Sequence, residues 1–295
     1  MVWLKNPEQA RAIYDGTRKA FTVIPFLIAP VTFVIDAGFG RFSPASSKLL
    51  VDGIKSWIFM ELVSPITFVS TFLQDPLSPS FPTSALNIPS SLTPSALLAL
   101  LYLIHYTNRS LVSPLRTPSR SKSHITVPMF AVGFNLLNGF LMGAYLASPS
   151  AENHLTGAFS RRRFWAGVSL WATGFASNVL HDEILLNIRR KAKGKAKESG
   201  GKEHYAIPQG YGYNLISYPN YFSEWVEWVG FALAASPAPS LASTSAFLET
   251  ISPPWIFVLS EVLLMLPRAW RGHRWYHSKF PDYPKQRKAV IPFLF

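Results

Sequence analysis

The sequence predicts an all-α membrane protein built as a bundle of seven transmembrane helices, and three observations support this fold class. Hydrophobic residues make up 48% of the 295 residues and charged residues only 15%, against roughly 25% charged residues in soluble domains. Seven stretches approach the length of about 20 mostly apolar residues that a helical span requires. The basic residues gather in alternate segments between these stretches. Composition therefore argues against a disordered chain and against an ordinary water-soluble domain.

The seven predicted spans form a single integral membrane domain, residues 1–295. They lie at roughly 20–37, 57–74, 92–108, 125–147, 164–186, 214–236 and 247–267. The first follows a charged leader and lacks an obvious small-residue cleavage site, so we interpret it as an anchor rather than a cleaved signal peptide. Hydropathy is only moderate, and the second and sixth spans could instead be half-buried helices. The Lys-rich stretch 191–202 is predicted to be a solvated cytosolic loop.

The distribution of charge predicts the orientation in the membrane. If the amino end faces outward, the inward segments contain 21 of the 28 Lys and Arg residues, as the positive-inside rule requires. The formal net charge of +12 is thus explained by topology, with the C-terminus in the cytosol. Nucleic-acid binding is disfavoured because the basic residues are divided among four loops, each beside an apolar span. The absence of cysteine excludes disulfides and thiolate ligands or nucleophiles.

Polar residues inside the predicted spans are functional candidates, since an ionisable side chain in lipid is costly unless it faces a cavity or a partner. Helical spacing places three groups of them on single stripes. The stripes are Tyr102, Tyr106 and Arg109 in the third span, Asn178, Asp182 and Arg189 in the fifth, and Asn220, Glu224 and Glu227 in the sixth, with Glu61 alone in the second. A single polar residue near a helix end could simply reach the interface, but several stripes in one bundle predict a common internal polar chamber.

The ligand of this chamber is predicted to be anionic. Arginines cluster at the cytosolic ends of the fifth and seventh spans, and a guanidinium group binds phosphate through its planar fork. These arginines are Arg189, Arg190, Arg268, Arg271 and Arg274. The segments Gly38–Gly40 and Gly210–Gly212 each begin a G-x-G pattern without completing a dinucleotide fingerprint, so a nucleotide would bind in a non-Rossmann manner. No His, Asp or Glu grouping has the spacing of a metal site.

Motifs in the C-terminal third carry a family resemblance. They are NVLHD from Asn178, YAIPQG from Tyr205, PNYFSEWVEWVG from Pro219, RAWRGHRWY from Arg268 and the closing KFPDYPKQRKAVIPFLF from Lys279. With these motifs the sequence resembles the membrane-embedded steroid 5α-reductase family. The match is highly specific over 164–295 and weaker through Gly38–Arg41, the segment from Trp57 to Leu62, and His105-Tyr106.

The resemblance implies an endoplasmic reticulum enzyme whose seven-helix bundle encloses NADPH and a hydrophobic steroid, with no obligate protein partner. The implied reaction reduces the Δ4 double bond of a 3-oxo-4-ene steroid by hydride transfer to C5. Glu61 and Tyr106 would hold the substrate carbonyl, with Trp57 and Met60 lining the substrate pocket. The implied cofactor-binding residues are Asn178, Asp182, Arg189, Tyr205, Asn220, Glu224, Arg268, His273 and Tyr276, with Glu224 beside the nicotinamide.

Three departures from the family pattern bear on this transfer of function. Met60 stands where steroid-reducing relatives commonly carry Gln, which removes a polar group from the carbonyl end. Gly272 replaces a frequent His, although His273 follows at once. Ala206 stands where some relatives have Arg, and the loop 190–204 is longer than theirs, which leaves its role as a lid open.

The chemistry of the two candidate catalytic residues is compatible with enone reduction. A donor aimed at the carbonyl oxygen stabilises the negative charge that grows there as hydride arrives. Tyr106 is such a donor, whereas Glu61 either donates as a protonated acid or remains ionised and orients the tyrosine. Two alternatives stay open: a related reductase that acts on an enoyl-CoA or a polyprenyl substrate, and a catalytically silent membrane protein that binds sterol or nucleotide.

Overall fold

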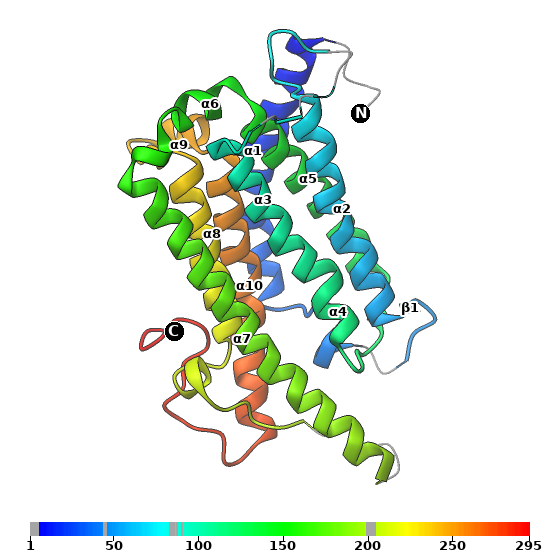
Figure 1. Ribbon diagram of the computed structural model, residues 1–295. Coiled ribbons are helices and arrows are strands. Elements are labelled where there is room, and N and C mark those ends of the chain that lie inside the picture. The colour runs from blue at the N-terminus through cyan, green and yellow to red at the C-terminus, as the bar shows by residue number, and fades with distance from the viewer. Residues whose placement is uncertain (1–5, 44–45, 83–85, 87, 90, 199–204) are drawn as a thin grey trace.

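Long helices run side by side along one axis and form an elongated bundle (Figure 1). The computed structural model describes residues 6–295 except 44–45, 83–85, 87, 90 and 199–204. Within these residues the chain is predominantly helical, so the prediction of an all-α fold is confirmed. The long helices are α1 (Pro7–Thr32), α2 (Gly53–Gln74), α3 (Pro94–Thr107), α5 (Thr126–Ala147), α7 (Arg162–Glu198), α8 (Pro219–Ala235) and α10 (Pro253–Lys279).

Short elements connect the long helices. Two two-residue strands, β1 and β2, pair antiparallel with Leu50 opposite His124. The short elements are η1 (Gly40–Phe42), β1 (Leu50–Val51), η2 (Asn108–Val112), α4 (Ser113–Arg116), β2 (Ser123–His124), α6 (Pro149–Leu155), η3 (Ala158–Ser160), η4 (Tyr211–Asn214) and α9 (Thr244–Thr250).

Local sequence explains where several helices begin. The Asn6 side chain accepts a hydrogen bond from the Gln9 N–H at 2.8 Å, and Thr93 accepts one from the Ala96 N–H at 3.1 Å. Asp52 does the same for two amides at the start of α2. These side chains satisfy amide groups that have no partner within the helix, and Pro follows the cap at the first turn of α1 and α3, where it is tolerated.

The first six predicted spans each overlap one long helix, and two of their boundaries are corrected. Helix α1 begins at Pro7, so the charged leader is itself part of the first helix. Helix α7 continues through Lys191 to Glu198, so the prediction of a loop over 191–202 is wrong for residues 191–198. Lys, Ala and Glu favour the helix, and they extend one that is already formed. Residues 199–204 lie outside the described part of the chain.

The number of membrane spans remains a prediction. By length and composition, α2 and α5 can each cross a membrane, and α9 with α10 adds a third crossing if the pair forms one span. That pair is bent by 115° at a break formed by Ile251 and Ser252 and followed by Pro253 and Pro254. Proline has no amide hydrogen for a continuous helix, so the predicted span 247–267 is divided in two.

Glycines allow the closest helix pairs to form. A Cβ atom at Gly143 of α5 would lie 2.6 Å from the Phe68 carbonyl oxygen of α2, and one at Gly174 of α7 would lie 2.4 Å from the Glu227 nitrogen of α8. Small residues at such crossings let two backbones approach. The α2–α5 and α7–α8 pairs thereby position the polar side chains of four helices inside the bundle.

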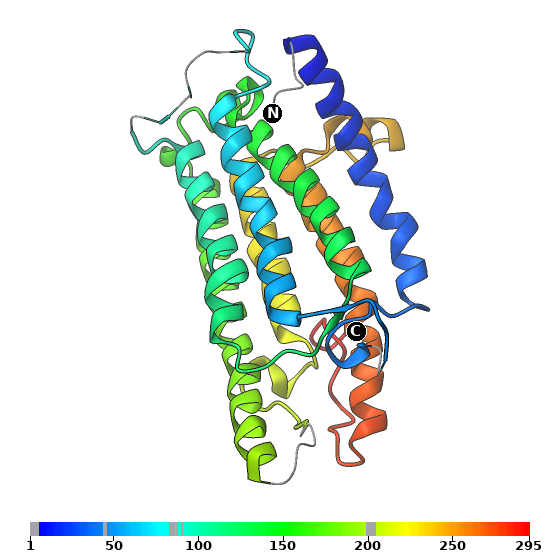
Figure 2. The same cartoon turned by 90° about the vertical axis from the view of Figure 1, so that its right-hand side faces the viewer.

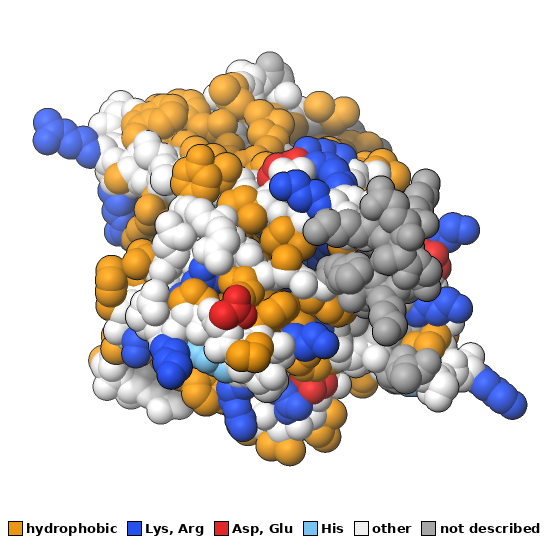
Figure 3. Space-filling view, turned by 90° about the horizontal axis from the view of Figure 1, so that it is seen from below, with side chains coloured by type: hydrophobic (Ala, Val, Ile, Leu, Met, Phe, Trp, Pro, Cys, Tyr) orange, Lys and Arg blue, Asp and Glu red, His pale blue; other side chains and the backbone are white. Residues whose placement is uncertain are grey.

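The two ends of the bundle differ in charge and in the elements they carry. The N-terminal segment, α6 and α9 lie at one end, whereas β1, α4 and the C-terminal residues lie at the other (Figures 1 and 2). Seen from the second end, Lys and Arg side chains are spread around the face with hydrophobic side chains between them (Figure 3). The segments predicted to be cytosolic therefore share one end of the bundle.

Candidate active site

A partly buried guanidinium group joins three elements in the interior. Arg109 donates through Nε to Glu61 Oε2 at 3.1 Å and through Nη1 to Glu224 Oε1 at 2.8 Å. Glu61 belongs to α2 and Glu224 to α8, and both carboxyl groups are buried. Arg109 itself lies in the π-helical segment η2 that follows α3, a conformation often found at functional sites.

A buried contact between an imidazole and a carboxyl group lies one helical turn away. His105 Nδ1 is 2.7 Å from Glu227 Oε1, and His105 Nε2 is 3.9 Å from Glu224 Oε1. The second carboxylate oxygen of Glu227 is buried and has no hydrogen-bond partner among the described residues. The imidazole therefore lies between two carboxyl groups of α8.

Hydroxyl and amide groups form a network beside these charges. Asn138 of α5 donates to the hydroxyl oxygens of Tyr106 and Tyr102 at 2.8 and 3.0 Å. Ser64 of α2 shares a 2.7 Å hydrogen bond with Tyr102. Because Tyr106 accepts from Asn138, its own hydroxyl hydrogen is available to another acceptor. In the described residues Glu61 pairs with Arg109 and makes no direct hydrogen bond to Tyr106, so it does not orient the tyrosine directly.

The predicted polar stripes of α7 and α8 face each other. Asn178 donates to the Asn220 carbonyl at 3.0 Å and to Glu224 Oε2 at 3.3 Å. Asn220 donates to Asp182 Oδ1 at 3.0 Å. The Oδ1 atom of Asn220 is buried without a partner among the described residues, which leaves an acceptor available to a ligand.

Two arginines, Arg109 and Arg120, lie near Trp57, and Arg120 makes no salt bridge to an acidic side chain among the described residues. The Trp57 indole donates to the Arg109 carbonyl at 3.1 Å, and the Arg120 guanidinium carbon is 3.7 Å from the Trp57 ring centre. Burial and the charge of Arg189 lower the pKa of Arg120 to about 9. An anion bound near Arg120 and Arg189 would relieve the repulsion between their two positive charges.

The remaining predicted cofactor residues lie at the basic end of the bundle. Arg268 covers the Phe39 ring at 3.6 Å and donates to the Phe39 carbonyl at 3.3 Å. Tyr276 is buried and its hydroxyl accepts from Arg41 at 3.4 Å. His273 Nδ1 is 2.6 Å from Ser217 Oγ. These three side chains, together with Tyr205, whose ring lies 5.0 Å from that of Trp275, form a second group outside the interior charge cluster.

Gly272 is explained by its neighbour. A Cβ atom at this position would lie 1.6 Å from the Tyr218 hydroxyl oxygen. No side chain fits there while Tyr218 keeps its position, so the His that the resemblance led us to expect at this position is sterically excluded. His273 is turned toward Ser217 instead, as the hydrogen bond above shows.

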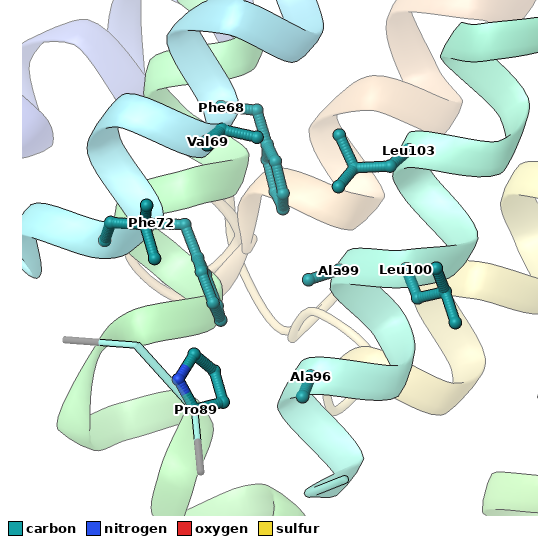
Figure 4. Close-up of a pocket in the computed structure, with 9 residues that line it drawn as sticks. Phe68, Val69, Phe72, Pro89, Ala96, Ala99, Leu100 and Leu103 are labelled. Carbon is teal, nitrogen blue, oxygen red and sulfur yellow. The ribbon is translucent and has the colours of Figure 1, made fainter. Parts of the chain in front are cut away.

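A pocket of about 220 Å³ lies between α2 and α3, away from the charged cluster. Figure 4 shows apolar side chains of both helices facing it, among them Phe68 and Phe72 from α2 and Ala99 and Leu103 from α3. The Phe68 ring stacks on Tyr102 at 4.2 Å. This aromatic pair forms a wall between the pocket and the hydroxyl network.

Sequence reasoning placed Arg109 on a stripe but gave it no role, and it missed His105 and Asn138 as parts of the site. Arg109 stood out only by its position three residues after Tyr106. His105 directly precedes Tyr106, so the sequence indicates no separate function for it, and Asn138 is a single uncharged residue in an apolar segment. Their importance depends on partners from other helices, which one helix cannot reveal.

Comparison with known proteins identifies the family. A family model described as 3-oxo-5-alpha-steroid 4-dehydrogenase matches residues 121–295. The chain belongs to the 3-oxo-5-alpha-steroid 4-dehydrogenase family. It is 34% identical to steroid 5-alpha-reductase DET2 of Arabidopsis thaliana, with 96% of this chain and 99% of the relative covered. The identity is 30% to 3-oxo-5-alpha-steroid 4-dehydrogenase 1 of Rattus norvegicus, with 88% and 87% covered.

The family match extends over nearly the whole length. An uncharacterized protein, C9.08c of Schizosaccharomyces pombe, is 36% identical, with 95% of this chain and 99% of the relative covered. The resemblance inferred from the C-terminal motifs is thereby confirmed. As a member of the 3-oxo-5-alpha-steroid 4-dehydrogenase family, the protein is an oxidoreductase.

Proposed function

We propose that the protein reduces the Δ4 double bond of a 3-oxo-4-ene steroid with NADPH, by hydride transfer to C5. Family membership supports the reaction class. The observation that carries the proposal is the Arg109 bridge, because one guanidinium contacts both Glu61 and Glu224. The acid proposed for the carbonyl and the acid proposed for the nicotinamide thus face one shared region inside the bundle.

Tyr106 and Glu61 would stabilise the carbonyl end. The Tyr106 hydroxyl is held by Asn138 as an acceptor, so its hydrogen can be donated to the 3-oxo group. Negative charge grows on that oxygen during hydride addition, and a positioned donor lowers the energy of this state. Paired with Arg109, Glu61 holds one end of the guanidinium in place. Trp57 and the buried Met60 would line the pocket around the steroid.

The residues proposed to bind NADPH fit its chemistry. The buried Asn220 Oδ1, which has no partner among the described residues, can accept a hydrogen bond from an amide or hydroxyl of the cofactor, and Arg120 near Arg189 suits a phosphate. Asn178 and Asp182 would orient Asn220, while Glu224 lies on the nicotinamide side. Arg268, His273, Tyr276 and Tyr205 would hold the rest of the dinucleotide at the basic end. When bound, NADPH supplies the hydride.

The membrane setting proposed for this enzyme is a multi-pass orientation in the endoplasmic reticulum with the C-terminus in the cytosol. Six of the predicted spans each overlap one long helix, the seventh overlaps the bent pair α9 and α10, and the basic segments lie at one end. Positive residues are retained on the cytosolic side, so NADPH would enter from that side and the steroid from the bilayer.

A second candidate substrate class is favoured by one observation. Met60 is buried beside Glu61, and it provides no polar side chain for a steroid carbonyl. An enoyl-CoA or a polyprenyl enone would need fewer polar contacts around its hydrocarbon part.

The test uses the purified full-length protein with NADPH and three acceptors: a 4-ene-3-ketosteroid, an enoyl-CoA and a polyprenal. We expect the ketosteroid to drive oxidation of the nicotinamide. Glu61→Gln and Tyr106→Phe should each lower kcat by about 100-fold, the usual cost of losing one stabilising group. Glu249→Gln on the exposed surface of α9 is the matched control and should leave kcat unchanged.

The outcomes separate the alternatives. Preference for another acceptor assigns the second substrate class. Turnover that survives the Glu61→Gln and Tyr106→Phe double variant would reject this site. Absence of turnover with any acceptor, with NADPH still bound, would instead indicate a silent binding protein.

A further inference from the structure

The interior of the bundle contains more acids than cations. Four buried carboxyl groups, those of Glu61, Glu224, Glu227 and Glu261, are accompanied by the guanidinium of Arg109 and the imidazole of His105. Burying several unpaired carboxylates costs far more than one guanidinium can offset. Among the described residues, Glu227 and Glu261 each have a buried Oε2 atom without a partner. Some of these four carboxyl groups therefore have to be protonated.

His105 is placed to pass a proton between two of these acids. Its Nδ1 atom is 2.7 Å from Glu227 Oε1 and its Nε2 atom is 3.9 Å from Glu224 Oε1. An imidazole can accept a proton on one nitrogen and release another from the opposite nitrogen. A small movement would shorten the longer contact to hydrogen-bond distance, as catalytic contacts do when ligands bind.

Arg109 cannot take part as a carrier because its guanidinium does not release a proton in proteins. Its contacts instead hold Glu224 and Glu61 in place. The proton path therefore ends at Glu224, which is the acid proposed to lie on the nicotinamide side. Glu227 begins the path because its second oxygen makes no other contact in the described residues.

We propose that Glu227, His105 and Glu224 form an internal proton relay that supplies the proton consumed in enone reduction. This inference rests on the proposed function. Hydride addition at the β-carbon converts the enone to an enolate and oxidises the nicotinamide. Glu224 then gives its proton to the α-carbon, His105 Nε2 reprotonates Glu224, and Glu227 protonates His105 at Nδ1, which leaves the imidazole in its other tautomer. A flip of the ring restores the starting arrangement before the next turnover. Glu227 regains one proton from water, so each turnover consumes one hydride and one proton.

The first experiment measures solvent isotope effects in the full-length enzyme. Glu227→Gln keeps the shape of the side chain but cannot exchange a carboxyl proton. We expect kcat to fall by about 100-fold, within the range for loss of acid–base assistance, with NADPH affinity unchanged and a larger solvent deuterium effect on kcat. Glu227→Asp should restore part of the rate. Glu249→Gln removes an exposed acid of α9 that lies outside this cluster and should change neither the isotope effect nor NADPH affinity.

The second experiment detects the proton without turnover. Infrared spectra of the protein in H₂O and D₂O should show a protonated-carboxyl stretching band that shifts on exchange and is lost in Glu227→Gln. Absence of a Glu227-dependent band would overturn the relay even in an active enzyme. An unchanged kcat and isotope effect in Glu227→Gln would overturn it as well. If the wild-type protein reduces no enone, the proposed function fails, while the band still reports whether Glu227 holds a proton.

Discussion

At the residue scale, the chemistry of the interior depends on which side chain pairs with which. Glu61 and Tyr106 were expected to act on one carbonyl, and the structure gives each of them a separate partner, Arg109 and Asn138. Because Tyr106 accepts from Asn138, its hydroxyl hydrogen can be donated to a ligand. Because Glu61 pairs with Arg109, its carboxyl group is held apart from the Tyr106 hydroxyl. The two residues can therefore serve one oxygen without being bonded to each other.

His273 provides a pH test at the same scale. Burial and the neighbouring His277 lower the pKa of His273 to about 4 from an ordinary value of 6.5. The unfolded chain takes up this proton first, so stability present above pH 6.5 is lost as the pH falls toward 4. The side chain is only half-buried, which reduces the effect through solvent screening.

We expect the melting temperature in detergent to fall less between about pH 7 and pH 5 for His273→Asn than for the wild type. Asparagine can keep the contact with Ser217. His124→Asn, at an imidazole that contacts Thr126, is the control and should follow the wild-type profile. A steeper fall in His273→Asn would show that the imidazole is not the acid-sensitive group.

At the element scale, glycines decide how closely the helices that carry the site approach each other. In Gly143→Ala the new methyl group would meet the Phe68 carbonyl oxygen at 2.6 Å, and such overpacking costs about 1–3 kcal/mol. Thermal unfolding in detergent should show this loss of stability, and kcat should fall because α2 carries Glu61.

Gly16→Ala is the matched control for this prediction. A methyl group at Gly16 of α1 meets nothing within 4 Å, so replacing a helical glycine should stabilise the protein by up to about 1 kcal/mol. Equal melting temperatures for the two variants would contradict the close α2–α5 packing.

At the scale of the whole molecule, the basic end should face the cytosol. The chain has no cysteine, so single cysteines can be introduced at exposed serines without background labelling. Ser278 lies near the end of α10 at the basic end, and Ser80 lies in the connection between α2 and α3 at the opposite end.

In sealed microsomes, an impermeant maleimide should label Ser278→Cys at once and Ser80→Cys only after the membrane is opened. Both variants should be labelled equally in detergent, which controls for accessibility. The reverse pattern would invert the proposed topology, and labelling of both in sealed vesicles would show that the two ends share one side.

The sequence by itself determined the helical character, the segregation of basic residues to one end and the family, because apolar segment length, charge placement and contiguous motifs are properties of the linear chain. It also determined which polar residues share a stripe. Only the tertiary structure decided which stripes meet, pairing Arg109 with both Glu61 and Glu224 and placing His105 between two acids. The spacing of residues in the sequence sets the direction of each side chain around its own helix. Which side chains pair between helices depends on how the helices rotate and pack against each other. Glycines such as Gly143 and Gly174 permit the close approach that this packing requires.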